Sequence, residues 1–111
     1  MTAQSAEDYV ADIRTEIRNI KKFTENKNSA QFKADTRTLY ACIRSLEIIG
    51  EAAKKTPAEF KKDHPQIPWK KMAAMRDVLI HGYFGTDAEI VWKTVTENIP
   101  ELEQAIKNTT P

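Results

Sequence analysis

The chain has 111 residues, which corresponds to one domain with a single hydrophobic core. Hydrophobic residues make up 41% and charged residues 30%, a balance typical of a soluble globular protein that excludes an intrinsically disordered chain. The formal net charge of +1 excludes a strongly basic surface, so any contact with a polyanion has to be local.

The N-terminal stretch "MTAQSAEDYV" lacks the basic and apolar regions of a signal peptide. The sequence also contains no run of about 18 consecutive apolar residues, the length that a transmembrane helix needs. We therefore expect a cytoplasmic protein that does not contact a membrane. The single cysteine, Cys42, cannot form an internal disulfide and lies among apolar neighbours. This setting indicates a buried free thiol rather than a reactive one.

The first helix is predicted from about Ala6 to Phe23. Its apolar residues recur at helical spacing, at Tyr9, Ile13, Ile17 and Ile20. Ser5 and Asp8, three positions apart, have the spacing of a capping box. The polar stretch "TENKNSA" then interrupts the helix.

A second, long helix is predicted from about Ala30 to Lys55. Its apolar stripe consists of Leu39, Cys42, Ile43, Leu46, Ile49 and Ala53. Tyr40 and Ile48 lie off this stripe, which predicts that the helix buries a second face. Gly50 inside a helix costs about 1 kcal/mol relative to alanine, so we expect another helix to cross closely at "IIGEAA".

Residues 56–68 carry three of the five prolines and predict a rigid connector. Thr56, Pro57 and Glu59 have the spacing of the N-cap, N1 and N3 positions of one short helical turn. His64, later in the same connector, is interpreted as a loop residue.

A third helix is predicted to begin near Trp69 and to stop around Gly82, a residue suited to a helix C-terminus. Thr86 and Glu89 repeat the capping-box spacing and open a fourth helix, which Pro100 is expected to kink or divide. Neither a strand pattern nor an internal repeat is found. The predicted fold is an all-α, up-and-down bundle of four to five helices in one domain, residues 1–111.

The stretch "MRDVLIHGYFG", residues 75–85, places polar chemistry at the end of the third helix. Asp77 and His81 are four residues apart and share a helix face, where the carboxylate can orient the imidazole. Arg76 precedes His81 by five residues, about 140° around the axis, so both can converge on one small group. An arginine that binds phosphate beside a histidine that titrates near neutrality is typical of a phosphodiester site. A structural interpretation is also open, with His81 as a C-terminal cap and Arg76 in a surface ion pair.

The run formed by Arg76, His81 and Tyr83 resembles the R-x4-H-x-Y signature of the HepT-like group of HEPN-domain proteins. The resemblance includes three further stretches in the expected order: "IGEA" (49–52), "PWKKMAAMRDVLIHGYFGTD" (68–87) and "IVWKTVTENIPELE" (90–103). It covers most of the chain from the second helix onward, and no motif position departs from the pattern.

This resemblance implies an all-α, HEPN-like homodimer that acts as a metal-independent endoribonuclease, the toxin of a toxin–antitoxin pair. Arg76 and His81 would be the catalytic residues and Asp77 their polar companion. The implied partner is an MntA-like minimal nucleotidyltransferase antitoxin, assembled with the toxin, that can transfer AMP to Tyr83. No cofactor is expected, and no metal site either, because His64 and His81 lie far apart without a cysteine or carboxylate cluster at ligand spacing.

A dimer also has a chemical rationale. RNA cleavage through the 2′-hydroxyl needs a base on one side of the phosphate and an acid on the other, and one histidine cannot occupy both positions. A twofold axis beside this helix end would supply two copies of His81 and Arg76. If the second helix crosses the third at Gly50, Glu51 could reach Arg76 or His81 and fix its orientation, and an exposed glutamate is the alternative.

Other interpretations stay open. The basic pairs at 54–55, 61–62 and 70–71 either guide the RNA backbone or belong to a solvated face, and Trp69 and Trp92 either stack on bases or pack in the core. The alternative function is a noncatalytic HEPN binding module, a partner or substrate-binding subunit of a nucleotidyltransferase. A helix-turn-helix DNA binder is disfavoured because no basic recognition helix is visible.

Overall fold

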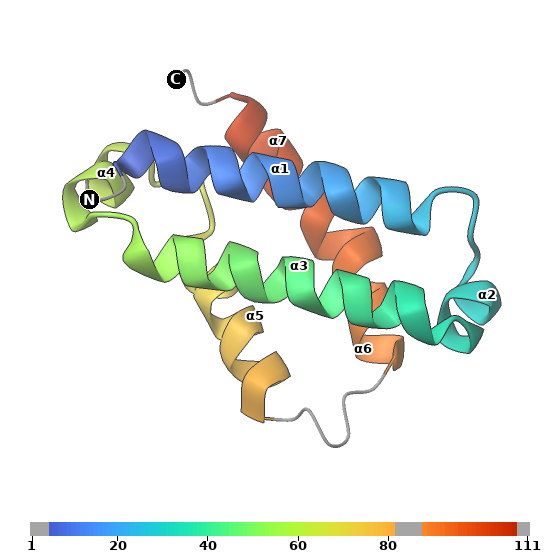
Figure 1. Ribbon diagram of the computed structural model, residues 1–111. Helices are drawn as coiled ribbons and strands as arrows, with labels where there is room; N and C mark the ends of the chain where they lie inside the picture. Colours follow the sequence, from blue (N-terminus) through green and yellow to red (C-terminus); the bar gives the residue numbers. More distant parts are fainter. Residues whose placement is uncertain (1–4, 82–87, 109–111) are drawn as a thin grey trace.

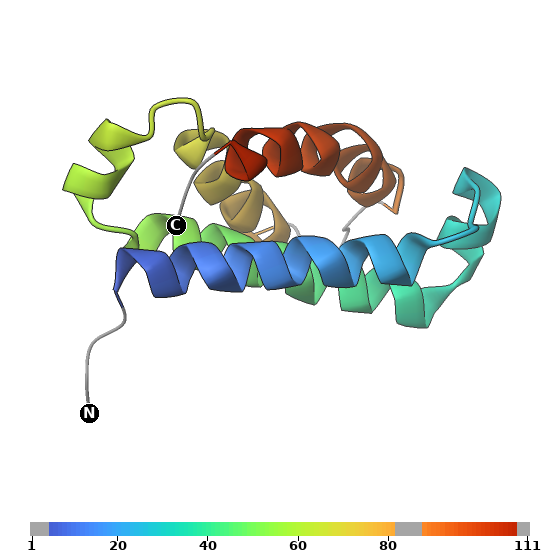
Figure 2. The same ribbon diagram turned by 90° about the horizontal axis from the view of Figure 1, so that it is seen from above.

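The computed structural model describes residues 5–81 and 88–108, and for residues 77–81 it describes the backbone alone. Within these ranges the chain is helical and contains no strand, which confirms the predicted all-α fold. Two layers of helices pack on each other (Figures 1 and 2). Helices α1 (Ala6–Thr24) and α3 (Thr36–Lys55) lie antiparallel in one layer, and α5 (Trp69–His81) lies in the other with the helical run of residues 88–107.

Helix α1 begins where the capping box predicted it. The Ser5 backbone N–H donates to Asp8 Oδ2 at 3.0 Å, and the Asp8 N–H donates to Ser5 Oγ at 3.2 Å. Four apolar residues of this helix are buried: Val10, Ile13, Ile17 and Ile20. The predicted first helix is therefore confirmed to within one residue at its C-terminal end.

The prediction of one helix from Ala30 to Lys55 is wrong, because Asp35 divides it. Helix α2 (Ser29–Ala34) ends at Asp35, which adopts an extended backbone and caps α3. The Asp35 carboxylate accepts hydrogen bonds from the Thr38 N–H at 3.1 Å and from Thr38 Oγ1 at 2.6 Å. These bonds satisfy donors at the start of α3 and override the apolar periodicity that runs across the boundary.

The second face predicted for α3 is only partly covered. Tyr40 is 66% exposed, contrary to the prediction, whereas Ile48 is half-buried. Most of the main apolar stripe is buried as predicted, with Cys42, Leu46 and Ile49 at 0% exposure, while Leu39 and Ile43 are partly buried. Helix α3 packs most extensively on α1 and on α5, so it is the central element of the fold.

The connector contains the short helix α4 (Ala58–Asp63), but its cap differs from the prediction. Pro57 holds the N-cap position without a side-chain hydrogen bond, whereas Thr56 ends α3 and donates its hydroxyl to the Ala52 carbonyl at 2.8 Å. Because this hydroxyl satisfies a carbonyl of the preceding helix, Thr56 does not cap the following one.

The last helical run stays continuous through Pro100. Helix α6 (Ala88–Lys93) leads into the π-helical turn η2 (Thr94–Asn98), which leads into α7 (Ile99–Lys107). The Ile99 N–H bonds the Thr94 carbonyl five residues back, immediately before the proline. Since proline lacks an N–H and crowds the carbonyl four residues earlier, the interruption expected at Pro100 takes the form of this wider turn. The predicted stop at Gly82 and cap at Thr86 lie outside the described residues.

The buried core is contributed by both layers. Residues exposed by 2% or less include Ile13, Phe32, Leu46, Ile67, Met72, Val91 and Leu102. Phe32 of α2 packs on Trp92 with ring centroids 5.1 Å apart, which attaches α2 to the start of the last helical run. Across the described ranges, no helix combines the length and apolar character needed to cross a bilayer.

Candidate active site

The polar motif residues lie on α5. Arg76 is half-buried on this helix, and positions 77 and 81 lie on its backbone, with His81 as its last residue. Positions 77 and 81 are one helical turn apart and share a face, whereas position 76 lies about 7 Å along the axis from position 81. Tyr83 lies outside the described residues, as do the side chains of Asp77 and His81. Their predicted roles stay predictions.

The crossing of α3 and α5 places Gly50 directly against Arg76. A Cβ atom built on Gly50 would lie 2.2 Å from the Cβ of Arg76, 2.9 Å from the Met72 carbonyl oxygen and 3.2 Å from the Arg76 Cα. Two of these three atoms belong to the α5 backbone, so even an alanine would force the helices apart. The predicted close crossing at "IIGEAA" is confirmed, and its contact point is the candidate catalytic arginine.

Glu51, the next residue of α3, faces a different neighbour. Its carboxylate accepts a hydrogen bond from Lys55 Nζ at 3.2 Å, and its side chain is 44% exposed. It also lines a shallow hollow of about 250 Å³ between α1 and α3. The role predicted for Glu51 toward Arg76 or His81 stays a prediction, and its described ion pair is with Lys55.

The packing of the two tryptophans favours the core interpretation over base stacking, because Trp69 is buried and Trp92 is partly buried against the core. Trp69 is 9% exposed, and its indole N–H donates to the His64 carbonyl at 3.0 Å. Its ring meets Phe60 edge-on at 6.1 Å, and Phe60 in turn stacks on the His64 ring at 4.1 Å. His64 therefore lies in the connector, as predicted, and its carbonyl holds the Trp69 indole in place.

Two lysines of the basic pairs form exposed ion pairs. Lys55 pairs with Glu51, and Lys71 Nζ lies 3.8 Å from a Glu101 carboxylate oxygen, with both side chains at least 60% exposed in the second pair. Exposed ion pairs of this kind contribute under about 1 kcal/mol. The solvated-face interpretation is sufficient for these two lysines.

Cys42 has no features of a reactive thiol. It is fully buried, and this burial raises the pKa of the thiol to about 11. A thiol that stays protonated in an apolar core is a poor nucleophile and metal ligand. Among the described residues, no three histidine, cysteine, aspartate or glutamate side chains come together as metal ligands.

One group of charged residues was missed at the sequence level. Arg14 and Arg18 of α1 meet Glu103 and Lys107 of α7 around a hollow. Arg14 and Arg18 are one turn apart on a helix, which indicates a basic face. The α7 residues lie more than 80 positions away, and a single sequence carries no signal that joins the two helices.

The described residues form an all-helical fold in which an arginine, an aspartate and a histidine lie on one helix. The chain belongs to the family described as ribonuclease HepT-like, which matches residues 13–109. It is 51% identical over 100 residues to a probable ribonuclease HepT from Thermococcus cleftensis, an alignment that covers 90% of this chain and 91% of that one. It is 41% identical over 112 residues to the putative RNase MJ0127 from Methanocaldococcus jannaschii, with 97% and 93% covered. No solved structure matches the chain.

Proposed function

We propose that this protein is a metal-independent endoribonuclease that works as a homodimer and as the cytoplasmic toxin of a toxin–antitoxin pair. The observation that carries the proposal is the family match over residues 13–109, which includes Arg76, Asp77, His81 and Tyr83. The relatives named as ribonucleases are aligned over nearly their whole length, so the likeness is to the complete relatives and not to one shared segment.

The position of Arg76 supports a role for its side chain in binding phosphate. Its Cα and Cβ are held at the contact with Gly50, so the origin of the side chain is fixed by the packing of two long helices. A guanidinium that starts from a rigid backbone loses less freedom when it binds two phosphate oxygens than one on a loop. In the proposed reaction, Arg76 stabilises the negative charge that builds on the nonbridging oxygens.

His81 supplies the proton transfers. In the proposed cleavage, one copy of His81 takes the proton from the ribose 2′-hydroxyl while the 2′-oxygen attacks the adjacent phosphorus. The bond from phosphorus to the 5′-oxygen then breaks, and the His81 of the second subunit gives its proton to that oxygen. The products are a 2′,3′-cyclic phosphate and a 5′-hydroxyl. Because the two histidines start in opposite protonation states, two subunits are needed and no metal enters the scheme.

Tyr83 provides the point of control. It follows His81 by two residues, so transfer of AMP to its hydroxyl by a nucleotidyltransferase antitoxin would add an anion next to Arg76. That phosphate would compete with the RNA phosphate for the guanidinium and would block access to His81. A hetero-oligomer of toxin and antitoxin is the proposed resting state.

The first experiment incubates the purified protein with total cellular RNA in excess EDTA, beside the His81→Ala variant, and maps the cut ends. Cleavage by the wild type alone, with 2′,3′-cyclic phosphate ends, is the expected result. Intact RNA in both samples, from dimeric protein unmodified at Tyr83, would instead favour the noncatalytic binding module.

A mixing experiment tests the composite site. Subunits of wild type and an excess of His81→Ala are unfolded together and refolded, so that most wild-type subunits pair with a variant subunit. If both subunits contribute to one site, activity per wild-type subunit falls as the excess grows. Constant activity per wild-type subunit would contradict the shared site and leave a monomeric nuclease.

A further inference from the structure

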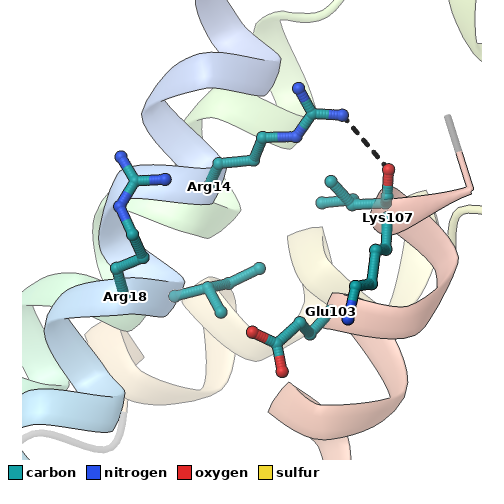
Figure 3. A pocket seen from close by; sticks show the side chains of 6 residues that line it. Arg14, Arg18, Glu103 and Lys107 are labelled. Carbon is teal, nitrogen blue, oxygen red and sulfur yellow. Dashed lines mark hydrogen bonds between the residues drawn. The ribbon is translucent and has the colours of Figure 1, made fainter. Parts of the chain in front are cut away.

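A hollow between α1 and the end of α7 gathers positive charge away from the motif helix. It has a volume of about 230 Å³ and is lined by Arg14, Ile17 and Arg18 from α1 and by Glu103, Ile106 and Lys107 from α7. Figure 3 shows the arginines of α1 and the charged residues of α7 on facing sides of this α1–α7 hollow. In Figure 1, the C-terminal end of α7 lies beside α1, whereas the His81 end of α5 lies on the other side of α3.

The charge at the α1–α7 hollow contrasts with the nearly neutral chain. Three cationic side chains line it against one carboxylate, while the whole chain carries a formal charge of only +1. The carboxylate of Glu103 also accepts a hydrogen bond from Lys21 Nζ at 2.9 Å, which brings a fourth cation to the rim. A concave surface that collects one sign of charge raises the local concentration of the opposite ion.

Hydrogen bonds orient both arginines of this hollow. Arg14 Nη2 donates to the Ile106 carbonyl at 3.2 Å and so joins α1 to the last turn of α7 (Figure 3). Arg18 Nη2 donates to Thr15 Oγ1 at 3.2 Å along its own helix. The isoleucines beneath are firmly packed, since Ile17 is 3% and Ile106 2% exposed. The hollow is thus built by the packing of two helices on an apolar floor.

One role of these cations is already accounted for. Arg14 and Lys107 lie at the C-terminal end of α7, where positive side chains satisfy the last carbonyls and complement the helix dipole. That structural role does not require Arg18, which lies one turn further along α1. A substitution of Arg18 therefore distinguishes a ligand-binding site from a helix cap.

We propose that the α1–α7 hollow binds a ribonucleotide, with the phosphate on Arg18 and Lys107 and a ribose hydroxyl on Glu103. Guanidinium and ammonium groups bind phosphate oxygens through charge-assisted hydrogen bonds. A carboxylate would repel a bare phosphate but accepts hydrogen bonds from sugar hydroxyls, so the mixture of groups fits a sugar phosphate better than an inorganic anion. The ligand would be either a free nucleotide or one residue of an RNA strand.

The size of the hollow predicts little selection among bases. With a volume of about 230 Å³, the hollow has room for a phosphate and a ribose, and the base would extend toward solvent. The site is separate from the Arg76 motif, so this proposal concerns binding and does not depend on the proposed cleavage. For an RNA strand, the hollow would be an anchoring point remote from the cut.

The test is a titration of the full-length His81→Ala protein with 5′-AMP and with a short single-stranded RNA, followed by NMR shifts of the α1 and α7 amides. Binding to the hollow is expected to move these signals, with UMP similar to AMP. Arg18→Ala should weaken binding about tenfold, the usual loss for a charge-assisted contact. The matched control is Lys22→Ala, which removes an equal charge from exposed α1 surface outside the hollow and should change affinity less than twofold.

The outcomes distinguish a free nucleotide from an RNA strand as the ligand, and a specific site from a diffuse effect of charge. Binding of AMP without RNA identifies a free nucleotide, and RNA that competes with AMP or binds alone identifies a strand. Equal losses from Arg18→Ala and Lys22→Ala would overturn the proposal, because they indicate a diffuse field and not a site. Absence of α1 and α7 shifts with millimolar AMP and with RNA would overturn it as well, whatever the cleavage assay shows.

Discussion

Gly50 and Arg76 share one contact, in which a Cβ on the glycine would lie 2.2 Å from the Cβ of the arginine. A close approach of α3 and α5 therefore falls on the residue that carries the candidate catalytic side chain. Gly50 lowers the intrinsic stability of α3, but it allows α5, the helix that carries the motif, to pack close to α3. This contact connects the packing of the core to the proposed chemistry.

Gly50→Ala is expected to destabilise the protein by about 1–2 kcal/mol. Overpacking a core contact costs about 1–3 kcal/mol, and the upper part of this range, about 2–3 kcal/mol, applies here because the clash involves the α5 backbone. Alanine regains about 1 kcal/mol through its helix propensity. Urea unfolding measures the change, and RNA cleavage is compared at equal folded fraction, where it should also fall because Arg76 shifts. Arg44→Ala, on the exposed side of α3 with a side chain 66% exposed, is the control and should stay within about 0.5 kcal/mol. A Gly50→Ala protein as stable as the wild type would contradict this expectation, because it would show that separating the helices costs no more than alanine regains in helix propensity.

Arg76→Ala is expected to keep the fold and lose cleavage. Alanine retains the Cβ that packs on Gly50, so the crossing survives while the guanidinium is removed. The expected loss in cleavage rate is about 10²–10³, the usual effect of deleting one donor to a developing oxyanion. Arg76→Lys keeps the charge without the planar fork and should recover only a small part of the rate. Full activity of Arg76→Lys would contradict bidentate phosphate binding, and parallel loss of folding and activity in Arg76→Ala would indicate a structural arginine.

His81→Ala separates catalysis from capping. The proposed proton transfer predicts no detectable cleavage from a protein whose circular dichroism and unfolding midpoint stay close to the wild type. A favourable charge at a helix C-terminus contributes up to about 1 kcal/mol at an exposed site, so a small loss in stability is compatible with catalysis. Global unfolding of the variant would instead show that His81 has a structural role.

Tyr83→Phe is the companion variant and should keep cleavage while it removes the site of AMP transfer.

Local signals in the sequence predicted the helices well. The Ser5–Asp8 capping box and the apolar spacing of α1 located that helix to within one residue, and Gly50 located the crossing with α5. The failures have local causes as well. Asp35 divides the predicted helix because its carboxylate accepts hydrogen bonds from Thr38. The sequence pattern alone does not indicate whether an aspartate within a helical apolar pattern caps a helix or continues it.

Features formed by distant residues could not be predicted in the same way. The exposure of Tyr40 depends on what α1 and α5 leave uncovered, and the hollow at Arg18 depends on α7 lying beside α1. The apolar periodicity of one helix does not indicate which other helices will pack against it. The motif was visible because Arg76, His81 and Tyr83 are close in sequence, and their roles came from resemblance to a family.

The Asp35 cap predicts a pH dependence of stability. The hydrogen bond from the Thr38 side chain, the Thr38 N–H and the nearby Lys27 lower the pKa of Asp35 from an ordinary 3.8 to about 2. Because the folded state has the lower pKa, the stabilisation is complete above about pH 4 and is lost as the pH falls toward 2. Asp35→Asn keeps a capping oxygen without the charge, so its deficit relative to the wild type should shrink over this interval in urea unfolding. Thr38→Val removes the largest cause and should reduce the pH dependence, and a deficit that is constant from pH 7 to pH 2 would contradict this origin.

The buried thiol of Cys42 predicts that chemical modification reports on unfolding. With its pKa raised to about 11 by burial, roughly one thiol in a thousand is ionised at pH 8 in the native protein, and the side chain is fully buried. Reaction with Ellman's reagent should therefore be slow in the native protein and should accelerate in urea in parallel with the loss of helical signal. Lys22→Cys adds an exposed thiol to the same chain and should give one fast and one slow phase. If both thiols react at the same rate under native conditions, α1 and α3 open locally around Cys42 far more often than their packing implies.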